Sequence, residues 1–320
     1  MTGQESRLPY PAVMRAVLVV NPQATATTPA GRDVLAHALA SQVKLDIVET
    51  DYRGHAMAAA AQAAVDNVDL VVAHGGDGTV NEVVNGMLSV GGPAPMLGVV
   101  PGGSANVFAR SLGLPRHPVE ATHLLLRAIE ENRKRVVSLG MVDIGAGQTR
   151  WFTFSAGMGW DAEVVADVDR KRGKKASPAL YTRIAAARYL RPRHGRPDLT
   201  VEIPGEDPIE GLRLAFVSNT DPWTYMGSRA IHLNHGTSFD TGLGLFALRT
   251  MRVPTVARHV TQAFSAKGET KGKNLVRRDD VAKLVVTAAK PVQLQCDGDL
   301  IGARTRVEFT SMPGALTVAI

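Results

Sequence analysis

The sequence predicts an α/β domain with a parallel sheet at the N-terminus, followed by a β-rich second domain that forms a sandwich or a curled sheet. Strand-like and helix-like segments alternate as far as residue 112, which indicates βαβ units. Beyond Arg135 the pattern changes to short strand-like runs separated by turn signals such as Pro204-Gly205. With 320 residues, 45% of them hydrophobic, the chain is long enough for about two domains.

Four apolar runs are expected to form the parallel strands: residues 16–20, 45–50, 70–73 and 96–100. Segments with a helical spacing of apolar residues follow them: residues 28–41, 54–66, 79–88 and 107–112. Ligands of open parallel sheets bind beyond the carboxyl ends of the strands. Those ends carry polar or glycine-rich residues: Asn21 and Pro22, Thr50, residues 74–77 and residues 101–104. We therefore expect a binding site built from four loops at one edge of the sheet.

The turn after the third strand reads AHGGDGTVNE, residues 73–82. Thr79 followed by Glu82 matches a capping box, so a helix is expected to begin there. The glycines at positions 75, 76 and 78 permit positive φ angles and leave backbone amides bare at the positive end of the helix dipole. Such a turn suits a bound phosphate, although a tight turn that binds nothing would need the same residues.

Asp77 favours a ligand at this turn. A carboxylate among bare amides is a poor direct contact for an anion, but it suits Mg²⁺ or a proton taken from an attacking hydroxyl. A second glycine turn, PGGSAN at residues 101–106, follows the fourth strand. Ser104 in this turn either caps the next helix or gives its hydroxyl to a phosphate. Neither turn matches the P-loop or the GxGxxG pattern.

Composition limits the class of partner and the compartment. The net charge of +6 favours anionic partners such as nucleotides, nucleic acid or an acidic membrane surface. The single cysteine, Cys296, excludes an internal disulfide framework and a cysteine-based metal cluster. No stretch approaches the ~18 uncharged apolar residues of a membrane span, and residues 1–13 lack the apolar core of a signal peptide. A cytoplasmic location is therefore expected.

The segments HGGDGTVNEVVNG, PGGSANVFARSLGLP, VVNPQAT and CDGD together resemble the diacylglycerol kinase catalytic-domain family. That family includes bacterial lipid kinases and sphingosine kinases and is related to NAD kinases. The resemblance covers most of the chain, from about Met14 onward, and implies two domains with the active site in the cleft between them. The domains it implies are residues 14–134, a mainly antiparallel β-sandwich domain at 135–300, and a segment at 301–320 that returns to the first domain. The β-like runs of this sequence fit that plan: residues 136–139, 151–155, 199–203, 212–218, 243–249, 281–287, 292–296 and 315–320.

The resemblance also implies a role for particular residues. Residues implied to contact ATP lie on the four loops: Asn21, Pro22, Thr25, Thr50, Gly75, Gly76, Asp77, Gly78, Thr79, Asn81, Gly103 and Ser104. Asp299 stands where lipid kinases usually carry the glutamate of a DGE motif, so it is implied to be the general base that accepts the proton of the lipid hydroxyl. From the residues alone, Asp297-Gly298-Asp299 is equally a hairpin turn.

Three positions depart from the family pattern. Val107 replaces the aspartate that usually ends PxGTxND, and Ser138 replaces the aspartate of a D-L-G segment. In bacterial lipid kinases these carboxylates help to organise Mg²⁺ and water, so Asp77 is left as the candidate for that role. Asp240, in Asp240-Thr241-Gly242, keeps one of two carboxylates that bind a structural Mg²⁺ in some members.

The implied activity is an ATP-dependent lipid kinase that converts diacylglycerol to phosphatidic acid, a reaction of phospholipid biosynthesis. A sphingoid-base or other lipid-alcohol kinase, an NAD kinase, and a nucleotide- or lipid-binding protein with a degraded site are the alternatives. The basic cluster 170–175 and the arginines that follow it suit an anionic bilayer at the inner membrane face, a solvated helix face, or less well nucleic acid. His232 and His235 show no further metal ligand nearby in the sequence, and the oligomeric state, including a homodimer, is left open.

Overall fold

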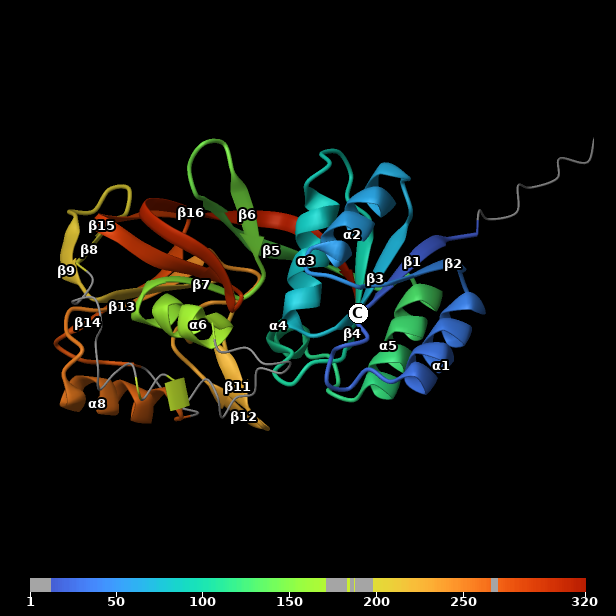
Figure 1. Ribbon diagram of the computed structural model, residues 1–320, viewed down its shortest axis with the longest axis horizontal. Helices are drawn as coiled ribbons and strands as arrows, with labels where there is room; N and C mark the ends of the chain where they lie inside the picture. Colours follow the sequence, from blue (N-terminus) through green and yellow to red (C-terminus); the bar gives the residue numbers. More distant parts are fainter. Residues whose placement is uncertain (1–12, 171–182, 185–186, 188–197, 266–269) are drawn as a thin grey trace, which may run out of the picture.

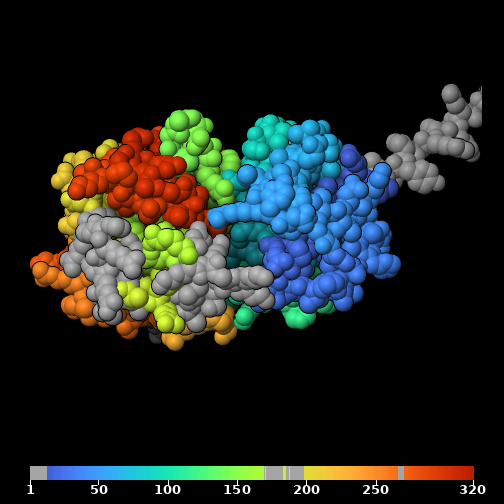
Figure 2. Space-filling view, in the orientation of Figure 1, coloured from blue at the N-terminus to red at the C-terminus, as the bar shows by residue number. Residues whose placement is uncertain are grey.

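Two domains lie side by side in the computed structural model, which describes residues 13–170, 183–184, 187, 198–265 and 270–320 (Figures 1 and 2). The first domain, drawn mainly in blue and teal, is α/β, and the second, drawn mainly in yellow-green, orange and red, is mainly antiparallel β. The predicted fold class is therefore confirmed.

The first domain is built around four parallel strands in the order β2-β1-β3-β4. Their bounds match the predicted runs closely: β1 (Arg15–Val20), β2 (Lys44–Glu49), β3 (Leu70–Gly75) and β4 (Met96–Pro101). β3 is buried along its whole length, as expected for a central strand of a sheet covered on both faces. All four strands end at the same edge, because they are parallel.

Helices cover both faces of this sheet (Figure 1). α2 (His55–Val65) and α3 (Asp77–Leu88) pack on one face, and α1 (Pro29–Ala40) and α5 (Pro118–Glu130) pack on the other. The short helix α4 (Val107–Ser111) follows β4. Four of these helices match predicted segments, whereas α5 was not predicted. Its signals are Pro118 in the first turn and the buried Leu125 and Ala128 three residues apart.

The second domain is a set of antiparallel strands that continue the same sheet: β6 (Thr149–Phe152), β7 (Ser155–Gly159), β8 (Leu199–Glu202), β9 (Ile209–Leu212), β10 (Leu214–Ser218), β13 (Leu243–Leu248), β14 (Leu275–Val281) and β15 (Lys283–Cys296). A separate hairpin joins β11 (Thr224–Met226) to β12 (Arg229–Ile231). α6 (Trp160–Arg170) and α8 (Val253–Ala263) were not predicted. None of the described helices is both long enough and apolar enough to cross a bilayer.

Two predicted strand assignments in this domain were wrong. The run at 151–155 is divided between β6 and β7, because the backbone between them turns its amides toward a buried carboxylate described below. The runs at 281–287 and 292–296 belong to one strand, β15, whose pairing with its neighbour shifts between Thr287 and Val292.

Two long strands connect the domains: β5 (Lys134–Asp143) and β16 (Asp299–Ala319). They pair antiparallel from Asp143 and Glu308 at one end to Lys134 and Ala319 at the other. Near its end β16 also pairs with β4, in parallel, through Val318 and Leu97. The main path through the sheet is β14-β13-β10-β7-β15-β16-β4-β3-β1-β2. Off this path, β5 pairs with β16 and β6, and β8 pairs with β15 and β9. The residue-level domain boundaries at 134 and 300 stay a prediction.

Candidate functional site

The four strand ends of the first domain are joined to one another by backbone hydrogen bonds. The amide of Asn21 donates to the carbonyl of His74 (2.9 Å), and the amide of Thr50 donates to the carbonyl of Val20 (2.9 Å). The amide of Gly102 donates to the carbonyl of Gly75 (2.7 Å). The predicted loop cluster is therefore a connected edge of the sheet.

The two glycine turns pack against each other backbone to backbone. A Cβ atom at Gly103 would lie only 2.6 Å from the Cα atom of Gly76, and one at Gly75 would lie 2.5 Å from Oγ1 of Thr79. The expectation of positive φ was wrong for Gly75, Gly76 and Gly78, which are absent from the residues with positive φ. These turns need glycine mainly for close approach, because there is no room for side chains between them.

This contact makes a testable prediction about stability. Gly103→Ala should lower the free energy of unfolding by about 1–3 kcal/mol, because the added methyl group forces the two turns apart. Gly78→Ala is a matched control, since a Cβ there meets nothing within 4 Å and alanine favours the helix. Urea unfolding of both variants measures the difference. Equal free energies of unfolding would contradict the close packing of the turns.

The predicted capping box at Thr79 and Glu82 was wrong. Helix α3 begins two residues earlier, at Asp77, and Gly76 is its N-cap without a side-chain hydrogen bond. The hydroxyl of Thr79 accepts from Nδ2 of Asn21 (3.0 Å), and the carboxylate of Glu82 accepts from the amide of Gly54 (2.9 Å). Both side chains therefore tie loops to α3, and the first amides of the helix stay at its open positive end.

Asp77 lies between the two glycine turns. Its Oδ1 atom accepts from the amide of Phe108 (3.2 Å) at the start of α4, so it acts on that helix as a capping carboxylate. Burial raises the pKa of Asp77 to about 6, the amides of residues 106–108 oppose that rise, and the negative charge of Asp297 adds to it. Asp77 is thus a partly buried ionisable side chain at this edge, with one oxygen already engaged.

The second glycine turn is closed by Asn106. Its Oδ1 atom accepts from the amide of Gly103 (2.9 Å), and its Nδ2 atom donates to the carbonyl of the same residue (2.8 Å). Asn106 has φ 48° and is the N-cap of α4, so the alternative in which Ser104 caps that helix was wrong. Ser104 and Thr25 are both exposed at the edge.

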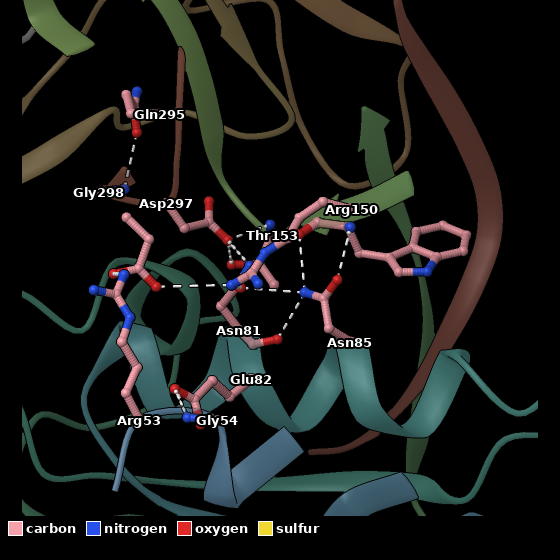
Figure 3. A network of polar contacts seen from close by, with 12 residues as sticks. Arg53, Gly54, Asn81, Glu82, Asn85, Arg150, Thr153, Gln295, Asp297 and Gly298 are labelled. Atoms are coloured by element: carbon pink, nitrogen blue, oxygen red, sulfur yellow. Dashed lines mark hydrogen bonds and ion pairs between the residues drawn. The ribbon is translucent and has the colours of Figure 1, made fainter. Parts of the chain in front are cut away.

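A carboxylate of the second domain lies against α3 (Figure 3). Asp297, buried and in the turn between β15 and β16, accepts hydrogen bonds from the backbone amides of residues 153–155 and the hydroxyl of Thr153. It also accepts from Nδ2 of Asn81 on α3 (2.8 Å). Burial raises the pKa of Asp297, while the donors from residues 153–155 oppose the rise. Asp297 therefore connects the two domains, a role that the sequence analysis missed.

The assignment of Asn81 to the phosphate-binding turn is corrected by this arrangement. Its side chain is fully buried. Nδ2 donates to Asp297 and to the carbonyl of Trp151 (3.0 Å), and Oδ1 accepts from the guanidinium of Arg150 (2.6 Å). One turn later, Asn85 exchanges hydrogen bonds with the backbone of Trp151. Both asparagines fasten α3 to β6, so the side chain of Asn81 faces the other domain and not the open turn.

Asp299 follows in the same turn, which has two central residues, Asp297 (φ 48°) and Gly298 (φ 81°). This is the hairpin geometry that the sequence allowed. The side chain of Asp299 is 18% exposed and lies between two arginines: Arg53 from the first domain (3.0 Å) and Arg150 from the second (3.7 Å). The sequence analysis missed both arginines, although Arg53 comes just after the second strand end.

Behind this turn lies a buried carboxyl group in the first turn of α6. Oδ2 of Asp161 accepts from Nε2 of Gln295 (3.2 Å), and Oε1 of Gln295 accepts from the amide of Gly298 (2.9 Å). Oδ1 of Asp161 has no partner among the described residues. Burial raises the pKa of Asp161 to about 7, against the hydrogen bond from Gln295. Asp161 is thus linked through one side chain to the turn that carries Asp299.

The raised pKa of Asp161 predicts a pH-dependent stability. The folded state binds the proton of Asp161 more tightly than the unfolded state, so the free energy of unfolding should fall as the pH rises from about 4 to about 7 and then level off. In Asp161→Asn that fall should be smaller by about 2–4 kcal/mol. Urea unfolding at pH 5 and pH 8 measures it, with the exposed Asp46→Asn as control. The same pH dependence in wild type and Asp161→Asn would contradict a raised pKa for Asp161.

Parts of this sequence are similar to known proteins. Residues 15–147 match the family described as the diacylglycerol kinase catalytic domain. This part of the chain therefore resembles that family. A diacylglycerol kinase of Bacillus subtilis (strain 168) is 28% identical over 79% of this chain and 78% of its own length. A protein named "Probable lipid kinase YegS-like" of Stenotrophomonas maltophilia (strain K279a) is 26% identical over 88% of this chain and 89% of its own length.

Solved structures share the fold. A diacylglycerol kinase from Bacillus anthracis str. Sterne covers 97% of this chain and 98% of its own, with a TM-score of 0.72 and 19% identity. An NAD kinase from Archaeoglobus fulgidus in complex with ATP covers 96% of this chain and 94% of its own, with a TM-score of 0.52 and 11% identity. The two-domain fold of this chain is thus shared with both of these structures.

The positions that depart from the catalytic-domain pattern are now placed. Val107 is buried in the first turn of α4, next to Phe108, whose amide donates a hydrogen bond to Asp77. Ser138 is buried in β5. Asp240 is 68% exposed and forms an ion pair with Arg135 (2.6 Å). Among the described residues, neither Asp77 nor Asp240 belongs to a group of three side chains with metal-binding spacing. The basic cluster predicted at 170–175 lies outside the described residues apart from Arg170.

Proposed function

We propose that this protein is a lipid kinase that transfers the γ-phosphate of ATP to a lipid hydroxyl, with diacylglycerol as acceptor and phosphatidic acid as product. The observation that carries this proposal is the contact between Asn81 and Asp297 (2.8 Å). It attaches the turn that bears Asp299 to α3, the helix whose N-terminus forms the first glycine turn. This contact therefore fixes Asp299, a carboxylate suited to proton transfer, relative to the N-terminus of α3, which suits phosphates.

On the nucleotide side, the two glycine turns would hold the phosphates of ATP through backbone amides. Asn21, Pro22 and Thr50 would shape the neighbouring loops, and the exposed hydroxyls of Thr25 and Ser104 would donate to phosphate oxygens. Asp77 fits Mg²⁺, because one of its oxygens is not engaged by α4 and Mg²⁺ commonly uses one or two carboxylates together with phosphates. When bound, Mg²⁺ would neutralise charge on the phosphates.

On the lipid side, Asp299 would accept the proton of the acceptor hydroxyl. The lipid oxygen then bonds to the γ-phosphorus while the bond from that phosphorus to the ADP oxygen breaks. Arg53 and Arg150 orient the carboxylate, since each lies within ion-pair distance of one of its oxygens. As in other phosphoryl transfers, the rate would come mainly from positioning and charge neutralisation.

The acceptor is insoluble in water, so the kinase would meet it at a bilayer. We place the protein in the cytoplasm, at the inner face of the membrane, with the basic cluster 170–175 as the contact. Nucleic acid is not a partner in this proposal, and a homodimer is compatible with it.

The test is transfer of label from γ-labelled ATP with Mg²⁺ in mixed micelles that contain diacylglycerol or a sphingoid base, and in solution with NAD. We expect labelled phosphatidic acid. Label on the sphingoid base or on NAD instead would replace diacylglycerol as the acceptor. Protein that binds ATP and labels none of them would overturn the kinase proposal in favour of a nucleotide- or lipid-binding protein. That second candidate is favoured by the missing carboxylates at Val107 and Ser138.

A further inference from the structure

A cluster of two histidines and an aspartate lies at the base of the β11–β12 hairpin, away from the residues assigned above. Oδ2 of Asp221 is 2.5 Å from Nδ1 of His232 and 3.8 Å from Nδ1 of His235. The candidate ligand atoms of the three residues all lie within 4.8 Å of one another. The sequence analysis saw no third ligand for the histidines, because Asp221 is distant from them in the chain and comes near only when the hairpin closes.

The backbone around the cluster is fixed on several sides. The amide of Asp221 donates to the carbonyl of Thr237 (3.2 Å), and the amide of His232 donates to the carbonyl of Ala263, the last residue of α8 (2.8 Å). The amide of Leu233 donates to the other carboxylate oxygen of Asp221 (3.3 Å), which leaves Oδ2 facing the histidines. The ligand atoms are thus brought together by the fold of the hairpin and not by a mobile surface contact.

The side chains are partly enclosed but reachable from solvent, with exposures of 9% for Asp221, 19% for His232 and 25% for His235. The two imidazole rings are stacked, with centroids 4.4 Å apart, and Nε2 of His235 is buried without a partner among the described residues. Arg277 and Asp279 also act electrostatically on His235, and their side chains pair with each other at 2.9 Å.

We propose that Asp221, His232 and His235 bind a divalent transition-metal ion of the Zn²⁺ class. Two nitrogen ligands and one carboxylate oxygen are a donor set that Zn²⁺ accepts, whereas Mg²⁺ and Ca²⁺ prefer oxygen alone. Ligand atoms of a tetrahedral Zn²⁺ site lie roughly 3.3 Å apart, and the candidate ligand atoms here all lie within 4.8 Å of one another, so side-chain shifts of about 1–1.5 Å would form the site. Each imidazole then carries its proton on Nε2.

The position of the hairpin gives this ion a structural role. Arg110 of α4 stacks on the ring of Tyr225, 3.3 Å from its centroid, and donates to the carbonyls of Gly227 and Ser228 at the tip. The hairpin therefore contacts the helix that Asp77 caps. An ion at its base ties β11, β12 and the loop before Thr237 together, and it stabilises the contact of the second domain with α4.

The experiment is titration of the full chain, free of any histidine tag, with Zn²⁺ by calorimetry and with Co²⁺ by visible absorption. We expect one equivalent to bind with a dissociation constant of about 10 μM or tighter, and a thermal midpoint that rises with metal. His235→Ala and Asp221→Asn, tested separately in case one fails to fold, should each weaken binding at least tenfold. The exposed His123→Ala is the matched control and should bind like wild type.

Absence of saturable binding by wild type up to about 1 mM metal, or binding by folded His235→Ala and Asp221→Asn equal to that of wild type, would overturn the proposal. The readout is metal binding and not phosphate transfer, so its result is independent of the kinase proposal.

Discussion

Replacing Asp297 with alanine should lower the free energy of unfolding by about 3–5 kcal/mol, because it removes the acceptor of several buried donors at once. The amides of residues 153–155, the hydroxyl of Thr153 and Nδ2 of Asn81 all donate to this carboxylate. Alanine leaves these donors without a partner in a site that water does not reach. Urea unfolding monitored by far-UV circular dichroism measures the loss.

Asp240→Ala is the control for the removal of an aspartate as such. Asp240 is exposed and paired with Arg135, so its loss should cost no more than about 1 kcal/mol. Asp297→Asn keeps the shape of the side chain but removes its charge. The NH₂ group of asparagine would face the amide donors of residues 153–155, so this variant should also be strongly destabilised. A loss below about 1 kcal/mol in both Asp297 variants would mean that this carboxylate does not hold the domains together.

Asp299→Asn should reduce phosphate transfer by about 10²–10⁴-fold, because an amide cannot accept the proton of the lipid hydroxyl. The free energy of unfolding should change little, since the side chain is on a two-residue turn at the surface and its partner Arg53 is 59% exposed. The measurement is the initial rate of phosphate transfer with labelled ATP and the acceptor that the labelling experiment identifies. The affinity for ATP is measured in the absence of acceptor.

Asp299→Glu is the informative companion variant. The lipid kinases that the sequence resembles usually carry glutamate at this position, so this variant should keep much more activity than Asp299→Asn. ATP affinity should be unchanged in both variants, because Asp299 belongs to the second domain. Full activity in Asp299→Asn would exclude Asp299 as the general base and direct attention to Asp77.

Local chemistry in the sequence was enough to place the four loops at one edge of the parallel sheet. Apolar runs ending in Asn21, Thr50 and the two glycine turns indicated parallel strands with their loops at one edge, and the structure has them there. The reason is physical: a buried strand needs a continuous apolar run, and a phosphate cradle needs bare backbone, so both leave a readable pattern.

The interface between the domains left no such pattern. Asp297, Asn81 and Arg150 are far apart in the chain, and their meeting depends on how the two domains are joined. Asn81 looks like part of the glycine turn in the sequence, but it lies within α3 and its side chain contacts Asp297 and Trp151. Asp221 and His232 show the same limit, because only the closed hairpin brings them together. Side-chain pairing over long sequence separations is what the sequence alone could not supply.

The pairing of β16 with β4 has a consequence for the order in which the protein is made. Val318, in the last strand of the chain, lies next to Leu97 in the first domain and covers an edge of the parallel sheet. During synthesis on the ribosome, residues 15–130 emerge long before β16 does, so the edge of β4 stays open until β16 has been made. The nascent first domain therefore depends on a strand that is distant in the chain for closure, and this interval is when the growing chain is most exposed to aggregation or in need of a chaperone.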